Sequence, residues 1–179
     1  MCKKIFFEWK TDEKKRKWAV TGVAALLLFL LYLVIFVFSG QDSEKSSSVS
    51  MEVTEKCVDI ADKVTGSNWS KPVKQKKAEF LEHYVRKTAH FCEYACMGIL
   101  VSGMWRPWKK RSWKLFLIVI VWVFVSASLD EFHQTFVSGR YGGISDVILD
   151  TCGGMFGYFV ISAGERLFLR NKSEFKIFS

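Results

Sequence analysis

Residues 18–38 form an uninterrupted run of uncharged, mostly apolar side chains near the start of the chain. The run contains 21 residues. At about 1.5 Å per residue, a helix of this length crosses the roughly 30 Å hydrocarbon core of a bilayer. The apolar part of a signal peptide is shorter, about 7–15 residues, and ends at a small-residue cleavage site. We therefore interpret this run as a retained membrane anchor.

Three further apolar runs follow, separated by charged connectors. Half of all residues in the chain are apolar, and most of them lie in the four runs taken together. The second run is the weakest candidate for a span, because it contains His90 and Glu93. We predict an all-α integral membrane protein, a four-helix bundle with four transmembrane helices. The expected spans are about 18–38, 89–105, 113–129 and 147–169.

The distribution of Lys and Arg predicts the orientation of these spans. Residues 1–17, 106–111 and 166–179 are basic, whereas the turn between the last two spans contains only Arg140. Basic connectors stay on the cytoplasmic side, so both termini are expected there. Topology and anionic lipid then account for the net charge of +8, and no nucleic-acid partner is needed. The expected organisation is a basic cytoplasmic tail at 1–17, a membrane domain at 18–169 and a cytoplasmic tail at 170–179.

The connector between the first two spans is long and polar, and its predicted place is outside the cell. Its Ser-rich part, up to Ser50, is typical of a loop. From Val49 to Val64, apolar residues recur at helical spacing with charged residues on the opposite face, which predicts an extracytoplasmic amphipathic helix. Its apolar face suits either the bilayer surface or the other helices. The next helix, over about 73–105, begins outside the bilayer.

Ionisable residues gather where the outer ends of the spans are expected. Arg86, His90 and Glu93 share one stripe of the second long helix. Asp146 and Asp150 fall in the first turns of the last span, after a Gly-rich turn. Such residues are costly at a membrane interface and so indicate a function. The candidate site residues are Arg86, Lys87, His90, Glu93, Asp130, Glu131, Gln134, Arg140, Asp146 and Asp150.

Two glycines predict how the helices pack around these residues. Gly153 and Gly157 form a small-xxx-small pair, which lets another helix approach closely. We expect the second span to pack against this groove. His90 and Glu93 would then lie near the aspartates at the start of the last span.

Several of these segments together resemble the VanZ-like family. The most specific are the His-x-x-Glu-Tyr block at 90–94 and the Asp-Glu-x-x-Gln-x-Phe block at 130–136, followed by Gly139-Arg140, Ser145-Asp146 and 150–154. The Phe38–Gln41 segment also resembles the start of the family pattern, and the likeness covers most of 18–168. One departure is Asp150, where many members of the family have Asn.

The resemblance implies a small multi-pass protein of the bacterial plasma membrane, often in Gram-positive species. The founding member of the family is associated with low-level resistance to the lipoglycopeptide teicoplanin. The family name therefore implies a phenotype and no particular reaction. We favour a non-enzymatic membrane protein that binds a membrane lipid or a lipid-linked cell-wall precursor. Its expected effect is to change the exposure of that target and to lower glycopeptide susceptibility.

The residues themselves leave several roles open. Arg86, Lys87 and Arg140 suit a phosphate or carboxylate, with Gln134, Asp146 and Asp150 completing a ligand-binding set. In an integral-membrane enzyme that modifies a phospholipid or lipid-linked precursor, His90, Glu93, Asp130 and Glu131 would be the catalytic groups. The same acids suit Mg²⁺ or Mn²⁺, or Zn²⁺ together with His133. Their spacing matches no strict metal-binding template, so we assign no metal site and leave the cofactor undetermined. Finally, paired charges at helix interfaces are often only structural.

Overall fold

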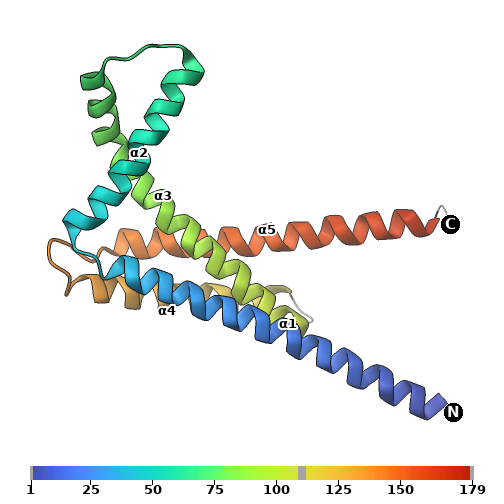
Figure 1. Cartoon of the computed structure of the whole chain (residues 1–179). Coiled ribbons are helices and arrows are strands. Elements are labelled where there is room, and N and C mark those ends of the chain that lie inside the picture. The colour runs from blue at the N-terminus through green and yellow to red at the C-terminus, as the bar shows by residue number, and fades with distance from the viewer. Residues whose placement is uncertain (1, 109–111, 178–179) are drawn as a thin grey trace.

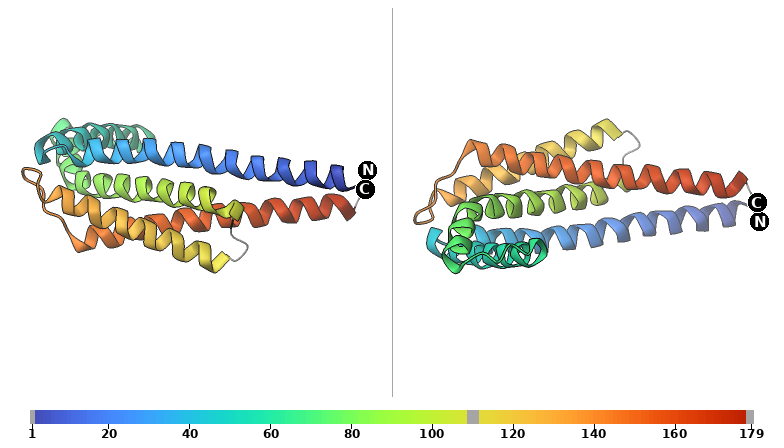
Figure 2. Two further views of the ribbon diagram at one scale, coloured as in Figure 1. Left: turned by 90° about the horizontal axis from the view of Figure 1, so that it is seen from below. Right: turned by 90° about the horizontal axis from the view of Figure 1, so that it is seen from above.

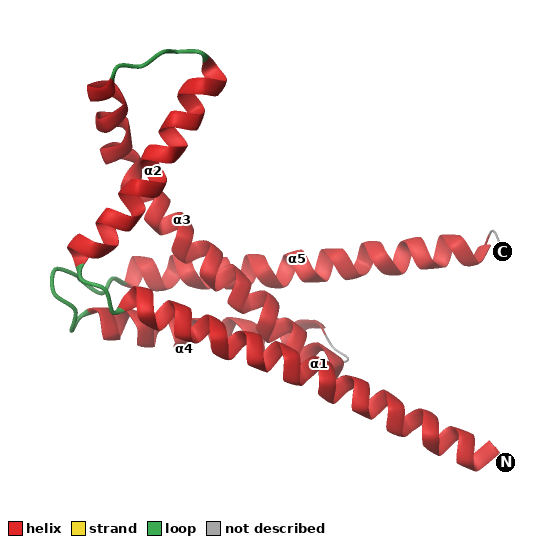
Figure 3. Cartoon of the chain, viewed as in Figure 1, coloured by secondary structure: helices red, strands yellow, loops and turns green. Residues whose placement is uncertain are grey.

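The computed structural model describes the backbone of residues 2–108 and 112–177 and the side chains of residues 12–108 and 113–168. These described residues form five α-helices and one short 3₁₀ helix, with no strand (Figure 3). The prediction of an all-α protein is confirmed. The elements are α1 (Cys2–Ser39), α2 (Ser43–Thr65), α3 (Lys71–Trp105), η1 (Arg106–Trp108), α4 (Ser112–Gln134) and α5 (Ile144–Ile177).

The long helices α1, α3, α4 and α5 run alternately in opposite directions and form the bundle (Figure 1). Helix α3 packs against α1, α4 and α5, and so occupies the centre. Both chain ends lie at the same end of the bundle (Figure 2). At the other end, α2 and the first half of α3 leave the bundle as a helical hairpin (Figure 1). We call the end of the bundle with the chain ends the terminal end, and the opposite end the hairpin end.

The core lies where α3 meets α4 and α5. Met97 and Val101 of α3 and Val119, Val123 and Ala127 of α4 are completely buried and belong to one apolar cluster. By contrast, α1 exposes large apolar side chains along its length. Because exposure of such a continuous apolar surface to water is unfavourable, this side of the bundle fits contact with lipid.

Three helical segments in the described part of the chain are long and apolar enough to cross a membrane. They are Asp12–Ser39 in α1, Trp113–Gln134 in α4 and Ile144–Phe168 in α5. The chain is therefore a multi-pass membrane protein. The predicted span 89–105 lies in the central helix α3, where His90 and Glu93 lower the mean hydropathy and neighbouring helices take the place of lipid. The count of four spans stays a prediction.

Two helices extend beyond the predicted spans. Helix α1 already begins at Cys2 and α5 continues to Ile177, so helix covers most of the predicted tails at 1–17 and 170–179. The basic side chains at 1–11, 109–111 and 169–179, which carry much of the predicted charge bias, lie outside the described residues. The predicted division into tails and membrane domain stays a prediction.

The predicted contact at the glycine pair of α5 is confirmed. A Cβ atom added at Gly153 would overlap the carbonyl oxygen of Phe91 in α3, and one at Gly157 would overlap that of Ala95. Gly98 of α3 lies equally close to the backbone of α5. The two helices therefore meet backbone to backbone, as small-xxx-small packing requires.

The outer hairpin differs from the prediction in two ways. The Ser-rich stretch expected as a loop is helical, because the Asp42 side chain caps α2 by accepting a hydrogen bond from the backbone N–H of Lys45 at 2.8 Å. The buried face of α2 is also mostly polar, whereas Val49 and Val53 of the apolar stripe remain exposed. The residues of α2 that are buried are Ser50, Thr54, Val58 and Asp62.

Polar pairs with α3 explain why α2 turns this face inward. The Ser50 hydroxyl donates a hydrogen bond to Glu82, and the Asp62 carboxylate forms an ion pair with Lys74 at 2.8 Å. Asp62 also accepts a hydrogen bond from the backbone N–H of Trp69 at 2.9 Å. The apolar stripe is therefore not the face that packs on α3, and its residues Ile60 and Val64 remain exposed.

Candidate functional site

A polar cavity of about 320 Å³ opens at the hairpin end of the bundle. It lies between α3, the end of α4, the α4–α5 loop and the start of α5. Its volume falls at the lower end of the range for small-molecule sites. Eight of the ten candidate residues line this polar cavity: Arg86, Lys87, His90, Glu131, Gln134, Arg140, Asp146 and Asp150.

A second cavity of about 250 Å³ adjoins the first, and we call it the side cavity. It lies between the end of α1, α2 and α3, and its lining includes Glu93. Most of its surface is apolar, from Phe38, Val49, Val53, Val85 and Ala89 among others. Both cavities are lined by Arg86, His90 and Arg140, which therefore stand at the junction of the polar and apolar compartments.

The Gly-rich loop between α4 and α5 positions Arg140. Gly139 makes the reversal with φ of 72°, a conformation that side chains disfavour. The Arg140 guanidinium then donates to the carbonyl oxygens of Ser39, at 3.4 Å, and Phe38, at 3.3 Å. These carbonyls end α1, where they have no partner within the helix and the helix dipole favours a cation.

Arg140 and Arg86 line the same two cavities. Among the described side chains, no Asp or Glu oxygen lies within ion-pair distance of Arg140. Burial lowers the pKa of Arg140, and the charge of Arg86 lowers it further, although a guanidinium stays charged at neutral pH. Arg86 forms an ion pair with Glu82 at 3.7 Å and donates a hydrogen bond to the Ser47 hydroxyl at 3.4 Å. Two neighbouring guanidinium groups of this kind are suited to an anion.

Carboxylates occupy the α4 and α5 side of the polar cavity. Glu131 is buried and accepts a hydrogen bond from the backbone N–H of Gly143 at 2.7 Å. Asp146 forms an ion pair with Lys87 of α3. Asp150 is only 1% exposed, and neither of its oxygens has a hydrogen-bond partner within the described part of the chain. The polar cavity therefore has a cationic and an anionic side.

His90 lies between these sides and is also incompletely paired. Its Nδ1 atom is buried and lacks a hydrogen-bond partner among the described residues. The nearest carboxylate oxygen, in Glu93, lies 3.7 Å away, which is too far for a hydrogen bond. An imidazole placed in this way can bind a ligand or exchange a proton with it.

Of the ten candidates, Asp130 alone lines neither cavity. It accepts a hydrogen bond from Gln134 at 3.1 Å, and the same amide group donates to Ser39 at 3.1 Å. His133 stacks on Phe36 of α1, with ring centroids 5.1 Å apart. No group of three or more His, Cys, Asp and Glu side chains in the described residues is arranged to hold a metal ion.

A family model described as VanZ/LLP1 matches residues 24–168 of this chain. The chain belongs to the VanZ/LLP1 family. The matched segment includes all ten candidate residues and every residue that lines the two cavities. No curated protein and no solved structure matches the chain.

Sequence reasoning missed several residues of this VanZ/LLP1 site. Ser39 binds Gln134 and Arg140, and its position was indicated only by the likeness of Phe38–Gln41 to the family pattern. The polar cavity is also lined by Ser43, His83 and Tyr141. Ser43 and Tyr141 reach it because the segments after α1 and α4 meet there, with the Ser43 N–H donating to the Ser138 carbonyl at 3.2 Å. His83 belongs to α3 and precedes Arg86 by three residues, so helical spacing could have added it to the stripe.

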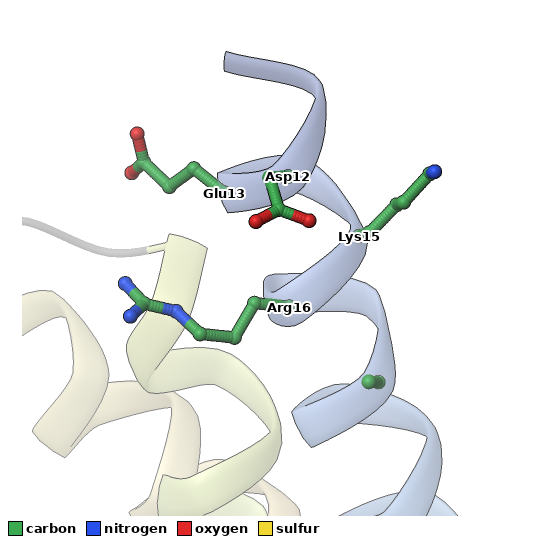
Figure 4. A pocket seen from close by; sticks show the side chains of 5 residues that line it. Asp12, Glu13, Lys15 and Arg16 are labelled. Carbon is green, nitrogen blue, oxygen red and sulfur yellow. The ribbon is translucent and has the colours of Figure 1, made fainter. Parts of the chain in front are cut away.

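Another hollow lies at the terminal end of this VanZ/LLP1 chain, beside the first turns of the described part of α1 (Figure 4). The labelled side chains do not converge, since Lys15 points away from the other three (Figure 4). Glu13 forms an ion pair with Lys17, at 2.8 Å, one turn along the same helix. This arrangement is typical of a solvated helix surface and not of a binding site.

Proposed function

We propose that this VanZ/LLP1 protein binds the head group of a membrane lipid, or of a lipid-linked cell-wall precursor, in the polar cavity. The binding takes place at the outer face of the bacterial plasma membrane and changes the exposure of that molecule. Its consequence for the cell is lower susceptibility to glycopeptides such as teicoplanin. In this proposal the chain has four spans and both termini in the cytoplasm, so the cavity lies on the outer side.

The junction between the two cavities carries this proposal. An amphiphile needs one polar and one apolar compartment, and the two cavities adjoin at Arg86, His90 and Arg140. The guanidinium groups suit the phosphate of a head group, because they supply several N–H donors in a planar fork. The side cavity, lined by Phe38 and Val53 among others, suits the first part of an acyl or polyprenyl chain.

The proposed orientation has separate support. The chain ends lie together at the terminal end of the bundle (Figure 2), whereas the residues that line both cavities belong to the hairpin end. Segments 1–17 and 166–179 are basic, and their described backbone lies at that terminal end. Since basic segments are retained in the cytoplasm, the hairpin end then faces outward.

Lipid binding can be measured by native mass spectrometry of the purified protein with phosphatidylglycerol. We expect Arg140→Gln to weaken binding about tenfold or more, because a charge-assisted bidentate contact is lost. Arg166→Gln is the matched control, since Arg166 is exposed near the other end of α5. Equal binding by the wild type and Arg140→Gln, or no bound lipid in the wild type, would contradict the proposal.

An enzyme that modifies the bound lipid is the second candidate function. His90 supports it, because an incompletely paired imidazole beside Glu93 has the composition of an acid–base pair. The two functions differ in their chemical outcome. Mass spectrometry of lipids and wall precursors, from cells with and without the protein, would reveal a new or missing covalent group only for an enzyme.

A further inference from the structure

We infer that the head group recognised by the polar cavity carries a primary ammonium group as well as an anionic group, with Asp150 as the acceptor of the ammonium. This inference rests on the proposed lipid-binding function and names the class of head group. Phosphoethanolamine is the simplest example. An amino-acid side chain on a lipid-linked wall precursor offers the same pair of groups.

The first observation is the state of the Asp150 side chain. It lies in the second turn of α5, lines the polar cavity and is 1% exposed. Neither carboxylate oxygen has a hydrogen-bond partner within the described chain. Buried carboxylates normally have partners, because an ionised one left without them is costly. A donor from outside the chain would complete this site.

The second observation is the charge around Asp150. Glu131, Asp130, Asp146 and Glu93 all lie close enough to act on it electrostatically. Of the basic residues in the cavity, Lys87 is already paired with Asp146. Carboxyl groups thus outnumber cations on the α5 side of the cavity, which suits a cationic group of a ligand.

The third observation is the separation of charge across the cavity. Arg86 and Arg140 stand at its junction with the side cavity, whereas Asp150 and Glu131 belong to its α4 and α5 side. A ligand with one anionic group would satisfy only the guanidinium side and leave Asp150 unpaired. A head group with both charges satisfies both sides at once.

The type of cation follows from the missing hydrogen bonds. A primary ammonium group has three N–H donors for the two oxygens of Asp150. A trimethylammonium group has the same charge but no donor, and so it leaves both oxygens unbonded. Discrimination between these two groups therefore tests hydrogen bonding separately from charge.

The experiment compares three lipids on the purified full-length protein by native mass spectrometry. They are phosphatidylethanolamine, its N-trimethylated form phosphatidylcholine, and phosphatidylglycerol, which has the phosphate but no cation. We expect the wild type to bind phosphatidylethanolamine about tenfold more tightly than the other two, the effect of a lost hydrogen bond to a charged group. Asp150→Asn should abolish this preference while phosphatidylglycerol still binds.

Controls separate this inference from the proposed function. Asp59→Asn removes a carboxylate of the outer hairpin that lies outside both cavities, and it should keep the wild-type preference. Wild type that binds all three lipids equally would overturn the ammonium inference and leave lipid binding intact. Wild type that binds none of them would overturn the proposed function itself. A preference that persists in Asp150→Asn would remove Asp150 from the acceptor role.

Two further experiments identify the source of the lipid and replace the Asp150→Asn variant if it does not fold. A lipid-linked wall precursor with a lysine side chain is added as a competitor of phosphatidylethanolamine, which distinguishes a precursor ligand from a phospholipid ligand. Soluble phosphoethanolamine shows whether the head group binds without its acyl chains. If Asp150→Asn does not accumulate, the wild type is tested with mono- and dimethylated phosphatidylethanolamine. Affinity should fall with each methyl group. Constant affinity across this series would overturn the inference.

Discussion

Gly157 of α5 lies directly against the backbone carbonyl of Ala95 in α3, with no room for a side chain between the two helices. Because the obstacle is backbone, it cannot move aside by changing a rotamer. We expect Gly157→Leu to separate α3 from α5 and to cost more than the roughly 1–3 kcal/mol typical of overpacking. The thermal midpoint in detergent and the amount of protein in the membrane measure this effect.

Gly164 provides a control in the same helix. It has no heavy atom near the position of an added Cβ. Gly164→Leu should therefore accumulate and unfold like the wild type. A Gly157→Leu variant with normal stability would mean that this contact does not hold the two helices together.

The glycine contact could be predicted from sequence because its signal is local. A four-residue spacing of small side chains, such as Gly153 and Gly157, identifies a close-packing face whatever the partner helix is. The polar stripe of Arg86, His90 and Glu93 could be predicted for the same reason. Helical geometry alone places such residues side by side.

The orientation of α2 could not be predicted in this way. Its apolar periodicity identified a stripe that includes Val49 and Val53, and left open whether this stripe meets the bilayer or the other helices. Which face packs is decided by bonds between distant residues, such as Ser50 with Glu82 and Asp62 with Lys74. Likewise, Ser39 joins the site only through the return of the α4–α5 loop to the end of α1. Neither relationship has a local signal.

The Asp62 side chain makes the outer hairpin sensitive to acid. The hydrogen bond from Lys74, and secondly that from the Trp69 N–H, lower the pKa of this carboxyl group below its ordinary value. Its stabilising effect is therefore present at pH above that ordinary value, about 4, and is lost as the pH falls through the lower folded-state value. Hydrogen exchange of α2, corrected for the intrinsic rate, should lose protection between about pH 6 and pH 2.5.

Two substitutions test the source of this pH dependence. Asp62→Asn should reduce the protection of α2 at pH 6 and flatten its change with pH. Glu52→Gln is the control, since Glu52 forms only an exposed pair with Lys56 within α2. An unchanged pH profile in Asp62→Asn would assign the acid sensitivity to another group.

The proposed topology predicts the accessibility of introduced cysteines. In a variant whose native cysteines are replaced by serine, Lys45→Cys at the start of α2 should react with an impermeant maleimide in intact cells. Lys14→Cys in α1 should react only after permeabilisation, because basic segments stay inside. Both lysines are exposed, so burial does not limit the reaction. The reverse labelling pattern would contradict both the topology and the outward-facing cavity.

The final prediction separates a working site from a structural brace. Glu131→Gln keeps an oxygen that can accept the hydrogen bond from Gly143, and His90→Ala removes a ring whose Nδ1 has no hydrogen-bond partner among the described residues. If the polar cavity binds a ligand, both variants should accumulate normally, and cells that carry them should be as susceptible to teicoplanin as cells without the protein. Membrane abundance and drug susceptibility are measured on the same cultures.

A purely structural role of these residues predicts a different result for abundance and phenotype. Loss of one partner from a buried charged network costs about 3–5 kcal/mol, so abundance would fall together with the phenotype. His133→Ala is the matched control, because His133 stacks on Phe36 and lines neither cavity. It should keep both abundance and phenotype. Full drug tolerance in a folded double variant, His90→Ala with Glu131→Gln, would reject the working site, because the junction histidine and the buried acid would then both be dispensable.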